Sequence, residues 1–451
     1  MFKSLICLAP LAATAQALFT EYQPSNQHNQ DDSQMPPQQQ QPPPPIGGGD
    51  PYDGSQGVPN RVFSSSWVGS PSNPQIIPPS QDHFYTVNTT LVNSQPNGKV
   101  LLERSMGING LYSGIEEAIQ MVYSTKDNYD GATSSVADIL IPRKDKLNGR
   151  IMAVALPEDS VCLDCAPSYN IFFRRSSPVI QSLLDEGYIV VIPDYEGVRG
   201  SYTVGHVSGT HILDALSATK DRVQELGIKG QFDVGIWGYG TAALASGWAA
   251  EMASDYAPHL DLKAAALGSV MANLTNWLIS SNGSPSSYLV ATSLLGMATE
   301  YKSVFVALED NLSPRRKKSF NSAANHCATD NTLRFLESDV LRGSFQNGYN
   351  IIADPNVRAV YDLNSLGKNA PKCNMFVYQG SQDSTTVLHD VRSLLKYYCS
   401  QGTTVKYHEI PDTTHAQGMD MYLDVIDFFD DAFANKVTSS CERIDGNFYQ
   451  N

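Results

Sequence analysis

The stretch that decides the fold is GYGTA at residues 238–242, which separates an apolar run from an alanine-rich one. The preceding DVGIW (233–237) predicts a buried strand, and the following LASGWAAEM (244–252) predicts a helix. Gly238 and Ala242 keep bulky side chains out of the connection between them. We therefore expect a tight strand-to-helix turn, and the same alternation of strand and helix recurs along the chain.

The alternation of short apolar runs with helical stretches predicts an α/β fold with a largely parallel sheet and helices on both faces. The expected strands are 118–124, 136–141, 150–156, 188–192, 232–237, 264–267, 374–378 and 405–410. The expected helices are 177–186, 211–226, 242–254, 387–400 and 421–434. Residues 271–365 contain helical pieces without a convincing strand, so we expect an inserted helical cap. Such a cap would lie over the carboxyl ends of the strands, where ligands bind in these folds.

The N-terminal region predicts an exported protein with its globular part at 61–270 and 366–451. Residues 1–17 combine a basic start, an apolar run and the small-residue site Ala15-Gln16-Ala17, as in a secretory signal peptide. The Pro/Gln-rich segment 18–60 is expected to be disordered. No later run is long and apolar enough to predict a transmembrane helix. The net charge of −15 argues against nucleic acid and anionic membranes as partners.

The turn has the setting of a nucleophile elbow, in which G-x-S-x-G places a serine between a strand and a helix. Here the middle residue is Gly240. Asp383 follows an expected strand in YQGSQD, and His415 follows the last one in TTHAQG. Nucleophile, Asp and His then stand in the chain order of an α/β-hydrolase triad, in which Asp orients the His that deprotonates the nucleophile. The sequence thus predicts a hydrolase site with glycine at the nucleophile position.

Three interpretations of Gly240 stay open. The protein is an impaired or inactive hydrolase whose pocket still binds acyl chains, an active ester hydrolase, or a secreted binding or interaction protein without activity. An active enzyme would use the Thr241 hydroxyl or a water molecule activated by His415. A β-branched threonine is poorly suited to an elbow with positive φ. Glycine adopts such a turn without steric cost, so the fold survives the loss of the serine.

The cysteines and sequons also fit an exported protein. Six cysteines remain after the signal peptide, and an even number suggests disulfides. The C-x-x-C at Cys162 and Cys165 has no second pair of the type that completes a zinc site, so no metal or cofactor is expected. Candidate glycosylation sites, the last two weakened by a following proline, are Asn88, Asn273, Asn282 and Asn311.

From about residue 78 the chain resembles the fungal secretory lipase family of lipase A type. The matching stretches are PPSQDHFY (78–85), CAPSY (165–169), GYIVVIPDYEGVRGSYTVG (187–205), HILDAL (211–216), the GYGTAALASGWAAEM segment, YQGSQD and the final histidine. The resemblance implies an α/β-hydrolase core with a helical cap that acts on acyl esters such as triacylglycerols, at a lipid–water interface and without a cofactor.

The resemblance also implies roles for single residues. The acid falls on Asp383, the base on His415 and the nucleophile on Gly240. The oxyanion-hole residues fall on Asp159 and on Thr241, where the family usually has glycine. The implied disulfides are Cys165–Cys327 and Cys399–Cys441, which leaves Cys162 and Cys373 unassigned.

Overall fold

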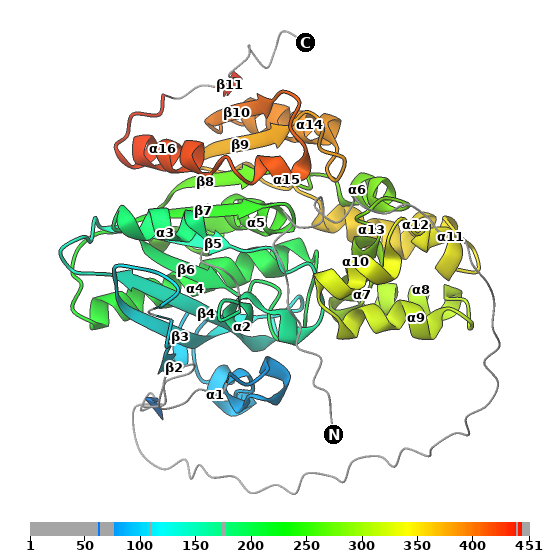
Figure 1. Cartoon of the computed structure of the whole chain (residues 1–451), viewed down its shortest axis with the longest axis horizontal. Helices are drawn as coiled ribbons and strands as arrows, with labels where there is room; N and C mark the ends of the chain where they lie inside the picture. Colours follow the sequence, from blue (N-terminus) through cyan, green and yellow to red (C-terminus); the bar gives the residue numbers. More distant parts are fainter. Residues whose placement is uncertain (1–61, 64–75, 109, 174–176, 439–440, 444–451) are drawn as a thin grey trace, which may run out of the picture.

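One twisted sheet forms the centre of the molecule (Figure 1). The computed structural model describes residues 62–63, 76–108, 110–173, 177–438 and 441–443, so the predicted signal peptide and tail lie outside the described residues. Within these ranges the sheet has eleven strands in the order β1-β2-β3-β4-β6-β5-β7-β8-β9-β10-β11. The pairs β2–β3, β3–β4 and β4–β6 are antiparallel and the remaining pairs are parallel. The predicted α/β fold with a largely parallel sheet is confirmed.

The strand bounds explain which strands the sequence reveals. Interior strands such as β5, β6 and β7 are buried along almost their whole length, which gives continuous apolar runs. Short or partly exposed strands lack that signal, and β1, β2 and β11 were not predicted. The strands are β1 Val62–Phe63, β2 Val100–Ser105, β3 Ile115–Lys126, β4 Ala132–Pro142, β5 Arg150–Ala155, β6 Ile189–Pro193, β7 Asp233–Tyr239, β8 Leu262–Gly268, β9 Asn374–Gly380, β10 Val405–Ile410 and β11 Cys441–Arg443.

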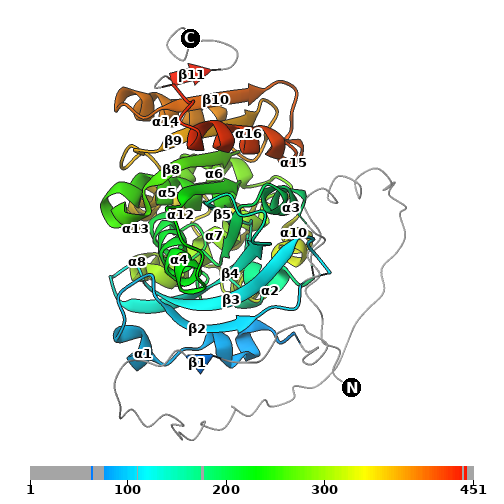
Figure 2. The ribbon, with the colours of Figure 1, turned by 90° about the vertical axis from the view of Figure 1, so that its left-hand side faces the viewer.

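Helices cover both faces of the sheet (Figures 1 and 2). One face packs against α4 (Gly205–Glu225), α5 (Thr241–Tyr256) and α14 (Leu388–Ser400). The other packs against α3 (Pro178–Asp185) and α16 (Tyr422–Phe433). The short helices are α1 (Thr89–Asn93), α2 (Pro167–Asn170) and α15 (His415–Gly418). None of the helices among the described residues is both long and apolar enough to cross a bilayer.

A helical insertion connects β8 to β9 and lies to the right of the sheet in Figure 1. It contains α6 (Leu274–Ser281), α7 (Tyr288–Glu300), α8 (Lys302–Asn311), α9 (Lys317–Asn321), α10 (Ala328–Phe335), α11 (Val340–Ser344), α12 (Asn350–Ala353) and α13 (Pro355–Asn364). Its only strand-like pairing in the described residues is one isolated bridge between Leu312 and Phe345. The insertion buries Val290, Leu294 and Met297 of α7 in the same core as α4 and α5.

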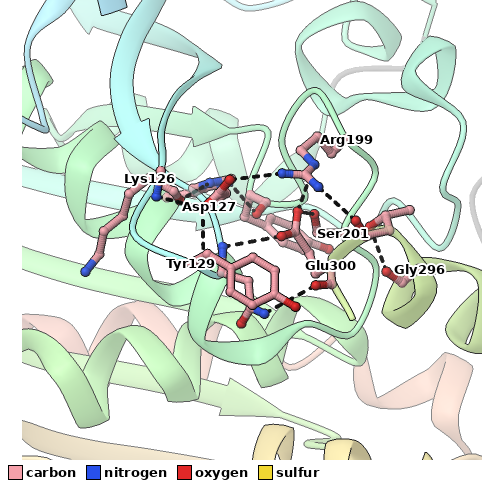
Figure 3. A network of polar contacts seen from close by, with 12 residues as sticks. Lys126, Asp127, Tyr129, Arg199, Ser201, Gly296 and Glu300 are labelled. Carbon is pink, nitrogen blue, oxygen red and sulfur yellow. Dashed lines mark hydrogen bonds and ion pairs between the residues drawn. The ribbon is translucent and has the colours of Figure 1, made fainter. Parts of the chain in front are cut away.

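A polar network fastens the end of α7 to the core (Figure 3). The Arg199 guanidinium contacts Asp127 at 3.1 Å and Glu300 at 3.2 Å, and it donates to the Thr299 carbonyl at 2.9 Å. Ser201 donates to the same Glu300 carboxylate at 2.9 Å. Because Glu300 is only 2% exposed, these partners supply the hydrogen bonds that water cannot.

Two disulfides tie distant segments together, and they join the pairs that the resemblance implied. Cys165–Cys327 spans a sequence separation of 162 and links the short 3-10 turn Leu163–Cys165 of the core to the start of α10 in the insertion. Cys399–Cys441 spans 42 residues and links the end of α14 to β11. The first bridge therefore fixes the insertion to the core.

The four sequons differ in their local geometry. The Nδ2 atoms of Asn282 and Asn311, where a glycan would attach, donate hydrogen bonds at 2.8 Å to an aspartate side chain and to a backbone carbonyl. Asn88 and Asn273 instead use Oδ1 to cap the starts of α1 and α6. The geometry thus favours glycans at Asn88 and Asn273, and this remains a prediction.

Asp214 on α4 gives the fold a pH dependence. Burial raises the pKa of this carboxyl to about 7, against hydrogen bonds from Thr125 at 2.7 Å and Tyr256 at 3.0 Å that lower it. The folded state therefore holds this proton more tightly than the unfolded chain, whose pKa is about 4. The stability that the proton contributes is complete below pH about 4 and is lost as the pH rises through about 7.

An asparagine at this position cannot ionise and keeps the shape of the protonated acid. As the pH rises from 4 to 8, the free energy of unfolding of Asp214→Asn is expected to increase by about 2–4 kcal/mol relative to that of the natural protein. Urea unfolding of both proteins across this pH range measures the gain. Asp255→Asn, at an exposed acid on α5, is the control. A difference that does not change with pH would contradict the prediction.

Candidate functional site

The connection between β7 and α5 has the backbone of a nucleophile elbow. Gly240 has φ 64° and ψ −123°, and its N–H donates to the Gly268 carbonyl at 2.9 Å. A Cβ on Gly238 would lie 2.3 Å from the Ala242 carbonyl oxygen and 2.5 Å from the Ser246 hydroxyl, so only glycine fits there. The strand extends to Tyr239 and the helix begins at residue 241, so the strand is longer than predicted and the turn is a single residue. Pairing of Tyr239 with Gly268 of β8 accounts for the extra length.

Gly240, Asp383 and His415 lie together at the carboxyl ends of β7, β9 and β10. His415 begins α15, and its Nδ1 lies 2.9 Å from Asp383 Oδ2. A Cβ on Gly240 would lie 3.6 Å from His415 Nε2 and 3.7 Å from its Cε1. Both contacts are ordinary van der Waals distances, so a side chain at position 240 would point at the imidazole without a clash. The arrangement has the geometry of a catalytic triad without the nucleophilic side chain.

Asp383 is held as an anion. Burial acts to raise the pKa of this carboxyl, but hydrogen bonds from His415, Ser269 and the residue 385 backbone hold it below its usual value. Its Oδ1 accepts the N–H groups of residues 385–386 at 2.8 and 3.1 Å, and its Oδ2 faces His415. The ionised Asp383 accepts a hydrogen bond from a proton on His415 Nδ1. The lone pair of the neutral imidazole is then on Nε2, which is directed at position 240. His415 can therefore act as a general base there.

Thr241 and Asp159 lie beside the elbow and are bound to each other. The Thr241 hydroxyl donates to Asp159 Oδ1 at 2.6 Å, and the Tyr202 hydroxyl lies 3.4 Å from the same oxygen. The hydrogen-bond partner of this threonine is therefore Asp159 and not His415. The first N–H groups of a helix have no intrahelical acceptor, and Thr241 is the first residue of α5. Its N–H can bind an oxyanion at this point.

Two further residues near the site, Glu196 and Ser269, were not predicted from the sequence. Glu196 follows β6 and is 1% exposed; burial and then the negative charges of Glu158, Asp159 and Asp194 raise its pKa well above the usual range. The signal for it was its place in PDYEG, directly after a buried strand. The Ser269 hydroxyl lies 2.7 Å from His415 Nδ1, and its one signal was its position at the end of β8 beside the elbow strand. In the described part of the chain no group of His, Cys, Asp or Glu is arranged to hold a metal ion.

The mostly parallel sheet, the elbow and the Asp–His pair at the strand ends together define an α/β-hydrolase fold. Comparison with known proteins narrows this class. The family model described as "Secretory lipase" matches residues 172–441, and the chain belongs to this family.

Named relatives include lipases and an esterase. Lipase A of Arthroderma benhamiae is 28% identical over 356 residues, which cover 73% of this chain and 74% of the relative. Trichothecene C-3 esterase of Fusarium sporotrichioides is 28% identical over 401 residues, which cover 83% and 90%. The crystal structure of Candida antarctica lipase A superimposes with a TM-score of 0.75 at 21% identity, covers 82% of this chain and 89% of that one, and shows the shared fold.

Proposed function

We propose that this chain is a secreted protein of the lipase and esterase type that binds acyl esters and is catalytically impaired. The observation that carries the proposal is Gly240, whose missing side chain would point at His415 Nε2 from 3.6 Å. Glycine has no atom that can attack a carbonyl. Loss of a triad nucleophile lowers kcat by about 10⁶, and binding and the oxyanion hole leave a residual acceleration.

A residual reaction follows from the groups that remain. The His415 side chain is 27% exposed, so water has access to the imidazole. His415 Nε2 takes a proton from this water, and the resulting hydroxide adds to the ester carbonyl. The N–H of Thr241 and the backbone N–H of Asp159, not the Asp159 carboxylate, would stabilise the oxyanion. Collapse expels the alcohol, which takes the proton back from His415. The Thr241 hydroxyl is a poor alternative nucleophile because its proton is donated to Asp159, a weak base, and not to His415.

The exposed side chains of the helical insertion favour an apolar substrate. We propose that the insertion acts as the cap of the site. Seven of the eleven exposed large hydrophobic side chains among the described residues belong to it, and we propose that they provide apolar surface for the substrate. They are Ile279, Phe305, Val306, Leu333, Leu336, Tyr349 and Leu363. Together with lipase and esterase relatives, these residues favour carboxylic esters with an apolar acyl chain, such as triacylglycerols, as the ligand class.

The natural protein beside His415→Ala tests this function. Short- and long-chain nitrophenyl esters should be turned over very slowly by the natural protein, without a burst, because no acyl-enzyme forms. His415→Ala should lower this rate to the level that binding and the oxyanion hole alone leave, while binding of a long-chain ester, measured by fluorescence, stays unchanged. Turnover within the usual enzyme range of about 1–10³ s⁻¹ would show that another nucleophile works and would contradict the impairment.

A further inference from the structure

Ser269 occupies a place between the acid and the base of the site. It follows β8, is completely buried, and its Oγ lies 2.7 Å from His415 Nδ1. The same hydroxyl donates a hydrogen bond to Asp383 Oδ2, which His415 Nδ1 also approaches at 2.9 Å. The three side chains form a closed triangle around one proton of the imidazole.

The protons of this triangle can be assigned by chemistry. An ionised carboxylate only accepts, so the single Ser269 O–H points to Asp383. The Ser269 lone pairs are then available to accept from His415, whose Nδ1–H is shared between the hydroxyl and the carboxylate. A neutral imidazole protonated on Nε2 would instead place the Nδ1 lone pair against the Asp383 charge. Only the Nδ1–H form satisfies all three groups, and it leaves Nε2 unprotonated toward Gly240.

We propose that Ser269 is a positioning residue of this site, which holds the His415 ring with Nε2 directed at position 240 and supplies Asp383 with a hydrogen bond. The inference rests on the proposed function. Ser269 is not itself a substitute nucleophile, because it is inaccessible and contacts the nitrogen on the far side of the ring from Gly240.

Ser269 has a strained backbone conformation that lowers stability, which supports a role in the site for its side chain. Its φ is 51°, a left-handed conformation that costs a residue with a side chain on the order of 1 kcal/mol. The conformation is fixed because the Ser269 N–H donates to the Tyr378 carbonyl at 2.9 Å, while the preceding Gly268 carbonyl accepts from Gly240. A glycine would relax this strain. The contacts of the hydroxyl with Asp383 and His415 therefore explain a serine at this position better than the backbone does.

Ser269→Gly and Ser269→Ala separate the hydroxyl from the backbone. Both remove the hydroxyl, but only glycine removes the strain, so the glycine variant should fold at least as well as the alanine variant. The first readout is NMR of the His415 ring in the natural protein, where we expect an Nδ1 proton protected from exchange with solvent. In both variants its exchange should accelerate on the order of tenfold, as for the loss of one hydrogen bond.

The second readout uses the Gly240→Ser background. There both Ser269 variants should lower kcat on the order of tenfold and leave KM within about twofold, because the base is misaligned while the ester still binds. An Nδ1 proton that stays equally protected in both variants would overturn the role of Ser269, whatever the esterase assays give. Faster exchange in both variants together with an inactive Gly240→Ser protein would support the role of Ser269 and refute a hydrolase site that lacks only its nucleophile.

Discussion

Gly240→Ser is expected to turn this chain into an ester hydrolase, with kcat about 10⁴–10⁶ times that of the natural protein. The added Cβ would lie 3.6 Å from His415 Nε2, so one rotamer brings a hydroxyl into hydrogen-bond range of that nitrogen. The elbow already has the positive φ of 64° that a serine must adopt there. The strain of that φ, on the order of 1–3 kcal/mol, is a cost to stability that the substitution introduces.

Two controls separate the hydroxyl from the change in size. Gly240→Ala adds the same Cβ and the same strain without a nucleophile, and it should remain as slow as the natural protein or slower. Gly240→Ser combined with His415→Ala should lose the gained activity because nothing deprotonates the serine. Initial rates on nitrophenyl butyrate and palmitate measure all four proteins. A serine variant that is no faster than the alanine variant would mean that the site no longer binds esters productively.

Removing the Cys165–Cys327 disulfide is expected to lower the free energy of unfolding by about 3–5 kcal/mol, since it closes a very long loop. The bridge spans a separation of 162 residues and joins the core to the insertion. Next to the disulfide, the Ser160 hydroxyl donates a hydrogen bond to the His326 carbonyl at 2.9 Å, also between the core and the insertion. A single hydrogen bond is too weak to replace the disulfide. Urea unfolding of Cys165→Ser/Cys327→Ser beside the natural protein measures the loss.

Two matched variants show whether the loss belongs to the bridge. Cys162→Ser changes a neighbouring cysteine that is in neither disulfide, and it should cost much less. Removal of Cys399–Cys441, with a separation of 42, should cost about 1 kcal/mol less than removal of the longer bridge. A double variant at Cys165 and Cys327 that unfolds like the natural protein would contradict the expected anchoring of the insertion.

The sequence predicted the central strands because their burial on both faces produces continuous apolar runs. It did not predict β2, whose VLLERS pattern is partly exposed, nor the two- and three-residue strands at the sheet edges. The elbow and the order of Gly240, Asp383 and His415 could be read because they are local motifs that each follow a strand. Their convergence in the structure follows from the shared edge of a parallel sheet.

Other features of the site depend on contacts that no local pattern encodes. Ser269 reaches Asp383 because β8 and β9 are neighbours in the sheet, although 114 residues separate the two in sequence. The bond between Thr241 and Asp159 likewise joins the start of α5 to the loop after β5, although 82 residues separate the two in sequence. The raised pKa of Glu196 depends on burial and on charges from a second loop. Each of these required the tertiary structure.

Our central claim is that the hydrolase site of this chain lacks only its nucleophile. The most direct test is covalent labelling with an alkyl fluorophosphonate, followed by mass spectrometry of the peptides. We predict that Gly240→Ser takes up one phosphonyl group at residue 240, that Gly240→Ser/His415→Ala takes up none, and that the natural protein also stays unlabelled. A natural protein labelled at Thr241 or Ser269, or a Gly240→Ser protein that stays unlabelled, would contradict a hydrolase site that lacks only its nucleophile.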